Sequence, residues 1–140
     1  MQSVEQALAL IPGRRDILNR IDDRLAHVIR YVERVLAELK PGVSAEISYE
    51  VPDGKFVLSF GKRNHGWCIL HGVEDDEDRD TTLIGASRQA RSEVFTIPDG
   101  EHQTPIERLI VAVAESLDEF AKESSPQLEN AMRLAAVSRL

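Results

Sequence analysis

The chain has 140 residues with a formal net charge of −7, and 42% of its residues are hydrophobic and 29% charged. A chain of this length is typical of one domain with its own core, so we expect a single domain over residues 1–140. The acidic balance argues against nucleic-acid binding through the phosphate backbone, which needs a basic face.

The cellular setting follows from what the chain lacks. Its single cysteine, Cys68, excludes an intrachain disulfide, which favours a reducing, cytoplasmic environment. No apolar run approaches the roughly 18 residues of a membrane span. We therefore expect an intracellular protein with no membrane partner.

The first third of the chain predicts two helices. Residues 3–11 form a short helix with Ser3 as its N-cap, ended by Pro12 and Gly13. A long helix from Asp16 to Leu39 follows. Its apolar residues recur at steps of three and four, which places them in one stripe: Leu18, Ile21, Leu25, Val28, Val32, Val35 and Leu39. Ile29 and Leu36 widen this stripe on one side.

The period then changes from 3.6 to 2, which indicates strands. Apolar and polar residues alternate over 44–61 around the turn Pro52-Asp53-Gly54, so this stretch predicts a β-hairpin. A third strand spans Trp67 to His71, with Trp67, Ile69 and His71 on one face. Thr81–Ile84 predicts a short fourth strand beside it.

The last third predicts helices again. Ser87 resembles the N-cap of a helix over residues 88–97, although residues 93–97 also suit a strand by propensity. Thr104, Pro105 and Glu107 form a helix start with a capping box, and that helix continues to about residue 122. Ser125 and Pro126 predict the start of a separate last helix.

This order of elements predicts an α+β fold. It consists of a long N-terminal helix, a three- or four-stranded antiparallel meander and C-terminal helices packed on one sheet face.

No catalytic or metal-binding motif is apparent. His65, Cys68 and His71 are spaced by three, which on a strand sends side chains to opposite faces. The acidic run 74–80 lacks the spacing of a calcium loop and is typical of a solvated loop. We therefore expect no metal, no cofactor and no catalytic group, although an active site assembled only by the fold would leave no spacing to detect.

One polar cluster suits an anionic ligand. Ser87, Arg88 and Arg91 lie at a predicted helix start, where backbone N–H groups and guanidinium groups can hold a phosphate. Lys62 and Arg63 could lie nearby, with Trp67 as a stacking surface. The competing interpretation, which we favour, is that Arg88 and Arg91 pair with the acidic loop, with Asp80 or with Glu93.

The stripe of the long helix also has two interpretations. It either covers the sheet or forms the seam of a homodimer, and both can hold in part. The sequence thus favours a small acidic, non-enzymatic module that binds another protein: a homodimeric adaptor, chaperone, immunity or inhibitor-like protein. The candidate partner-binding residues are Leu18, Leu25, Val32, Glu74, Asp75 and Asp76. The alternative is a protein that binds a small ligand or nucleotide through the arginine cluster.

Overall fold

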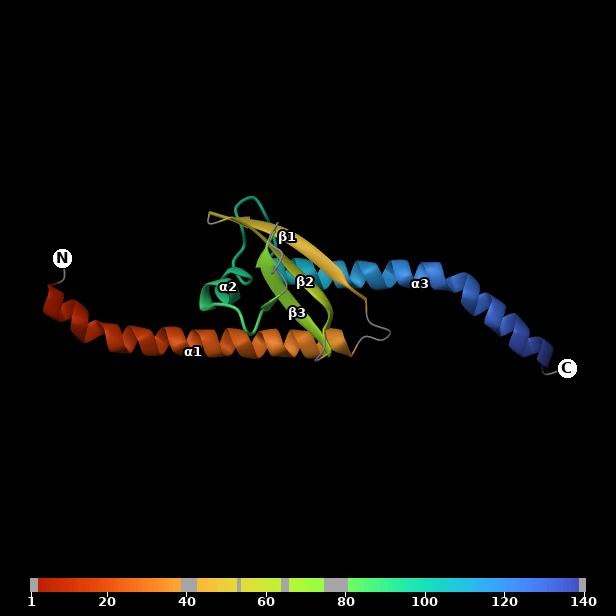
Figure 1. Ribbon diagram of the computed structural model, residues 1–140, viewed down its shortest axis with the longest axis horizontal. Coiled ribbons are helices and arrows are strands. Elements are labelled where there is room, and N and C mark those ends of the chain that lie inside the picture. The colour runs from red at the N-terminus through yellow and green to blue at the C-terminus, as the bar shows by residue number, and fades with distance from the viewer. Residues whose placement is uncertain (1–2, 39–42, 53, 64–65, 75–80, 139–140) are drawn as a thin grey trace.

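The computed structural model describes residues 3–38, 43–52, 54–63, 66–74 and 81–138 (Figure 1). The elements are α1 (Val4–Ala37), β1 (Ala45–Val51), β2 (Gly54–Arg63), β3 (Gly66–Val73), β4 (Thr81–Thr82), α2 (Arg88–Glu93) and α3 (Pro105–Ser138). A strand block flanked by helices in sequence is the predicted α+β arrangement, which is confirmed.

The four strands form one antiparallel meander in the order β1-β2-β3-β4. The predicted hairpin is present, with Ile47 opposite Leu58 and Tyr49 opposite Phe56. In the second hairpin Phe60 lies opposite Ile69 and Leu58 opposite His71. Directly opposed residues project to the same face, so these side chains share one face of the sheet.

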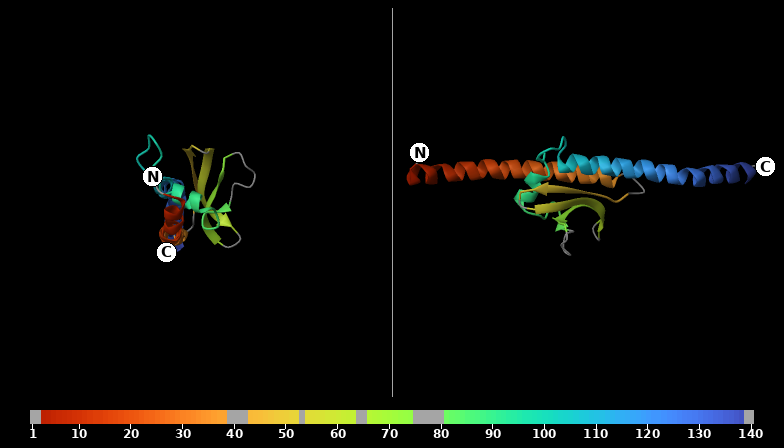
Figure 2. Two further views of the ribbon diagram at one scale, coloured as in Figure 1. Left: turned by 90° about the vertical axis from the view of Figure 1, so that its left-hand side faces the viewer. Right: turned by 90° about the horizontal axis from the view of Figure 1, so that it is seen from above.

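Both long helices cover that same face (Figure 2). α3 lies over β1 and β2, whereas α1 lies over β3. The core between the two layers is aliphatic with a few aromatic rings, and its fully buried large side chains include Ile29, Leu58, Phe60, Ile69, Leu83, Val94, Leu109 and Val113. Burying each such side chain contributes about 1.5–3 kcal/mol, so this contact holds the helices on the sheet.

The two long helices also bond to the backbone of strands β3 and β1. The carboxylate of Glu33 on α1 accepts the backbone N–H of Ile69 at 2.8 Å, and the carbonyl of Ile69 accepts from Leu83 N–H at 2.9 Å. On the opposite edge, Arg108 of α3 donates to the carbonyl of Ser48 at 2.8 Å. Both edges of the sheet therefore have backbone groups satisfied from α1, α3 or the β4 segment.

The predicted break at Pro12-Gly13 is wrong, because α1 is one helix of 34 residues that contains Pro12. Ser3 caps it as expected, and Gln6 completes a capping box. A proline removes one N–H and crowds the preceding turn, which bends a helix without always ending it. Here the bend lies in an exposed stretch, where water can bind the carbonyl that loses its partner (Figure 1).

The predicted separate last helix is also wrong. α3 is one helix to Ser138 that contains Pro126, and its C-terminal part is bent (Figure 1). Its start is as predicted, since Thr104 and Glu107 bond to each other's backbone N–H groups at 3.2–3.3 Å.

The segment 88–97 begins as a helix but ends early. α2 spans Arg88–Glu93, and Val94 is its C-cap, fully buried. The carbonyl of Val94 accepts from Ile106 N–H at 3.1 Å, which ties this corner to the first turn of α3. Burial of Val94 against α3 thus outweighs the continuation of the helix predicted to residue 97.

Candidate functional site

Both long helices extend beyond the sheet at opposite ends of the molecule (Figures 1 and 2). We call Val4–Leu18 of α1 the N-arm, residues 118–138 of α3 the C-arm, and the rest of the described chain the body. Within the N-arm every residue except Ala7 is exposed, and so is every residue of 118–137 except Ser124. The arms therefore make no packing contact with the body that would bury a side chain.

The arms nevertheless carry large apolar side chains. On the N-arm the exposed fraction is 77% for Val4, 62% for Leu8 and 59% for Leu18. Others there are Leu10, Ile11 and Ile17, and the C-arm has Phe120, Leu128, Met132, Leu134 and Val137. Large apolar side chains that gather in this way on an exposed helix are typical of an interaction surface.

The apolar stripe predicted for the long helix is only partly buried. Ile29 and Leu36, predicted only to widen the stripe, are the buried residues of α1. Leu25 and Val32 are half-buried, whereas Leu18, Ile21, Val28 and Val35 are exposed, and Leu39 lies outside the described residues. The face that packs on the sheet is thus turned toward Ile29 and Leu36, which leaves part of the stripe uncovered.

Most of the apolar arm surface was missed from the sequence. The residues Val4, Ala7, Ile11 and Leu18 keep the three-and-four spacing across Pro12, in phase with the stripe that follows. That continuity of phase is the signal that could have identified one uninterrupted helix. The C-arm has a weaker, alanine-rich face, and Pro126 conceals its continuity in the same way.

Arg91, predicted as a ligand-binding residue, is bonded within the protein. Its Nε and Nη2 donate to the two carboxylate oxygens of Asp22, each at 2.9 Å, and its Nη1 donates to the carbonyl of Ile84 at 3.0 Å. This hydrogen bonding lowers the pKa of the Asp22 carboxyl and raises that of Arg91. This partner is a residue of α1 and not Glu93, whereas Asp80, also considered from the sequence, lies outside the described residues.

The other members of the predicted ligand cluster are divided between two places. Arg88 lies 3.6 Å from Asp22 with its side chain 59% exposed, and Ser87 accepts from Ala90 N–H as the cap of α2. Trp67 stacks on Phe60 and lines an open hollow with His27, Arg30, Glu33, Arg34 and Ala37.

The distance along α1 separates these two groups. Asp22 and Arg34 are twelve residues apart, which is about 18 Å at ~1.5 Å per residue. Lys62 is paired with Trp67 across β2 and β3, and Arg63 with Gly66, so these residues lie at the Trp67 end. The structure therefore does not bring the six residues together, and ligand binding by this cluster stays a prediction.

The acidic loop can be placed only at its first residue. Glu74 lies 3.9 Å from Lys55, which also lies 3.5 Å from Glu50, and Glu74 N–H donates to the Lys55 carbonyl. Asp75 and Asp76, predicted to bind a partner, lie outside the described residues, as does His65 of the histidine-cysteine spacing.

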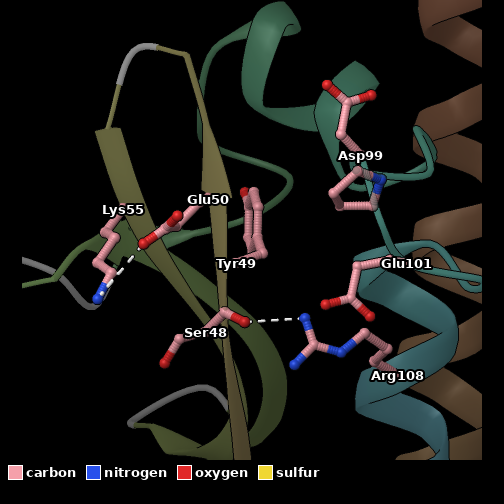
Figure 3. A pocket seen from close by; sticks show the side chains of 8 residues that line it. Ser48, Tyr49, Glu50, Lys55, Asp99, Glu101 and Arg108 are labelled. Carbon is pink, nitrogen blue, oxygen red and sulfur yellow. Dashed lines mark hydrogen bonds and ion pairs between the residues drawn. The ribbon is translucent and has the colours of Figure 1, made fainter.

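A cavity of about 280 Å³ lies beside β1, between that strand and the first turn of α3 (Figure 3). Its charged groups are Glu50, Lys55, Asp99, Glu101 and Arg108, of both signs. Lys55 and Arg108 already contact Glu50 and the Ser48 carbonyl, as the dashed lines in Figure 3 show. The two cationic side chains of this cavity are thus already bonded to groups that line it.

A buried polar pair lies beside this cavity. The Tyr49 hydroxyl and His71 Nε2 are 2.8 Å apart, and both rings pack against Phe56. Burial raises the pKa of the Tyr49 hydroxyl and lowers that of His71. A neutral imidazole that accepts from the hydroxyl fits these surroundings, so this pair satisfies two polar groups within the core.

Burial also raises the pKa of the Cys68 thiol, with Glu33 acting in the same direction. A raised pKa keeps a thiol protonated and slow to react. Among the described residues, no group of three or more His, Cys, Asp or Glu side chains converges for a metal ion.

The arms therefore remain the surface whose chemistry is unexplained by the fold. None of the described helices holds an apolar stretch long enough to cross a lipid bilayer. Comparison with protein-family models, with curated proteins and with solved structures found no match.

Proposed function

We propose that this protein is a non-enzymatic protein-interaction module that acts as a homodimer, of the adaptor, chaperone, immunity or inhibitor-like kind. The observation that carries the proposal is the pair of helical arms, whose apolar side chains the described chain leaves exposed. Isolated helices of this length are marginal in water, and an amphipathic helix is normally stabilised by packing of its apolar face. A second chain supplies that packing.

The surface available for association continues onto the body. Ile21, Val28 and Val35 of α1 and Ile110 and Val111 of α3 are exposed there. Glu33 marks the flank of α1 that faces the β3 edge, and helical spacing puts Val28 and Val35 on the opposite flank, toward α3. The apolar surface thus extends from both arms along the helix layer.

Native mass spectrometry and light scattering across a concentration series test the proposal. We expect a species of twice the chain mass of 15.7 kDa at micromolar concentration. The double variant Leu8→Gln/Leu134→Gln should raise the dimer dissociation constant at least tenfold, since both side chains are more than half exposed in the single chain.

The matched control is Ala9→Gln/Glu129→Gln, which changes the same arms on their polar sides. It should leave the dissociation constant unchanged, while circular dichroism shows that both variants keep their helices. A wild-type protein that stays monomeric throughout the series contradicts the proposal.

A further inference from the structure

The two arms of one chain cannot cover each other, because they leave the body in opposite directions (Figures 1 and 2). A second copy can cover both arms if a two-fold axis perpendicular to the long axis of the molecule relates it to the first. The C-arm of the second copy then lies beside the N-arm of the first copy, and its N-arm lies beside the C-arm of the first copy. Such an interface is closed, since each copy gives and receives the same contact.

We propose that each arm is covered by the opposite arm of a second copy, N-arm against C-arm, with the two helices antiparallel. This inference rests on the proposed homodimer and specifies how its halves join. The antiparallel direction follows from the two-fold axis, because α1 and α3 run in the same direction within one chain (Figure 1).

The bends of the two arms support this pairing. Each arm contains one internal proline, Pro12 in α1 and Pro126 in α3. Pro12 is six residues before Leu18, and Pro126 is six residues after Phe120. When the prolines are placed level in an antiparallel pair, Leu18 is level with Phe120 and both bends fall at the same height. Two bent helices can then stay in contact over their whole length.

One charge pair of the arms agrees with the same alignment. Arg15 and Glu123 are each three residues from their prolines on the inner side, so they lie level, with opposite signs. Helical spacing places Arg15 next to Ile11 and Leu18, and Glu123 next to Phe120, at the border of the apolar side of each arm. This pair, repeated at both ends of the dimer, favours the register.

Pairing between like arms lacks the Arg15–Glu123 pair. Two antiparallel C-arms with level prolines set Glu123 level with Glu129, of like charge, although they also set Glu119 level with Arg133, of opposite charge. Two antiparallel N-arms with level prolines set Arg15 level with Ala9. Arg15 and Glu123 therefore meet an opposite charge at this height in the N-arm to C-arm pair and in neither pairing of like arms.

The apolar content is sufficient for a stable dimer. Among the described residues each chain brings six large exposed apolar side chains from its N-arm and five from its C-arm: Val4, Leu8, Leu10, Ile11, Ile17, Leu18, Phe120, Leu128, Met132, Leu134 and Val137. A standard interface has roughly 20–30 residues on each side, of which about half of the area is apolar.

Cysteine cross-linking tests the pairing directly. Ala7 and Ala131 are five residues from their prolines on the outer side, so the proposal places them level. In a Cys68→Ser background, Ala7→Cys/Ala131→Cys should form a covalent dimer under mild oxidation, because each end brings one cysteine of each kind together. Ala7→Cys alone and Ala131→Cys alone should remain uncoupled, and a mixture of the two single variants should couple again.

The register has its own control. Ala7→Cys combined with Ala121→Cys puts the second cysteine ten residues away, about 15 Å along the helix at ~1.5 Å per residue, so coupling should be lost. Cross-linking of a single variant, or a ladder of larger covalent species, overturns the proposed pairing. A dimer by native mass spectrometry with no coupling of Ala7→Cys/Ala131→Cys overturns the pairing but leaves the homodimer standing. A monomer at every concentration overturns both.

Discussion

The two halves of α1 have the same amphipathic pattern and opposite surroundings. In the second half Ile29 is fully buried against the sheet, whereas in the first half Leu18 is 59% exposed. α3 shows the same contrast in reverse order, since Leu109 is fully buried and Leu134 is 71% exposed. Periodicity therefore identifies the apolar side of a helix, but it does not specify whether the rest of the same chain covers that side.

The largest expected effect is in the body. Phe60→Ala removes a fully buried ring at the centre of the sheet face, and should lower the free energy of unfolding by about 3–5 kcal/mol. Leu134→Ala on the C-arm should change the unfolding of the monomer by less than about 0.5 kcal/mol. Urea denaturation at a protein concentration below the dissociation constant of the proposed dimer measures both, and equal losses would contradict the division into body and arms.

The next effect is at the junction between the body and the N-arm. Asp22→Asn leaves the guanidinium of Arg91 without its carboxylate, where the two side chains are only 16% and 12% exposed. Charged hydrogen bonds of this kind contribute roughly 1.5–3 kcal/mol, and a loss of that size is expected in urea denaturation. Arg88→Ala is the matched control, because its contact with Asp22 is longer and exposed, and should cost under about 0.5 kcal/mol.

The same junction gives a pH dependence. The folded pKa of Asp22 is lowered from its ordinary value of 3.8, so the stabilisation is present above pH 3.8 and is lost as the pH falls through the folded pKa. The Asp22→Asn variant should therefore lose less stability than the wild type on acidification below about pH 4. If the free energy of unfolding of the wild type and of the Asp22→Asn variant falls equally on acidification, the ion pair does not stabilise the junction.

The smallest effect is at the buried Tyr49–His71 pair. Tyr49→Phe removes the hydroxyl that bonds to His71 and should cost about 1–2 kcal/mol in urea denaturation. Burial lowers the pKa of His71, so the unfolded chain takes up a proton near pH 6.5 before the folded protein does. The free energy of unfolding should consequently fall as the pH decreases through 6.5, by at most about 1.4 kcal/mol per pH unit for one proton.

His71→Phe should remove this slope, whereas His27→Gln, at an exposed position of α1, should keep it. Urea denaturation at a series of pH values between 5 and 8 measures the slope. This range extends about 1.5 pH units either side of the ordinary pKa of histidine. A slope that survives His71→Phe would assign the proton to another group.

Local signals predicted much of the fold. Alternation over 44–61, the turn at Pro52 and the capping pair Thr104 and Glu107 each depend on residues close in sequence, and each is found as expected. The continuity of α1 through Pro12 was missed because the local cost of a proline was given more weight than the phase of the stripe on either side.

The contacts that organise the candidate site could not be predicted in this way. Asp22 and Arg91 are 69 residues apart, and Glu33 and Ile69 are 36 apart, so no spacing links them before the chain is folded. The separation of Arg91 from Trp67 has the same origin, since it depends on where α2 and β3 meet α1.

The side chains that bond to the backbone of β1 and β3 have a consequence for aggregation through the sheet. An exposed strand edge is a template for strands of other molecules and a starting point for fibrils. Glu33 occupies the Ile69 N–H on one edge, and Arg108 occupies the Ser48 carbonyl on the other. A protein that displays so much apolar helix at its ends thus has fewer free backbone groups through which its sheet could stack, so the self-association that we propose uses the helices instead of amyloid-like growth.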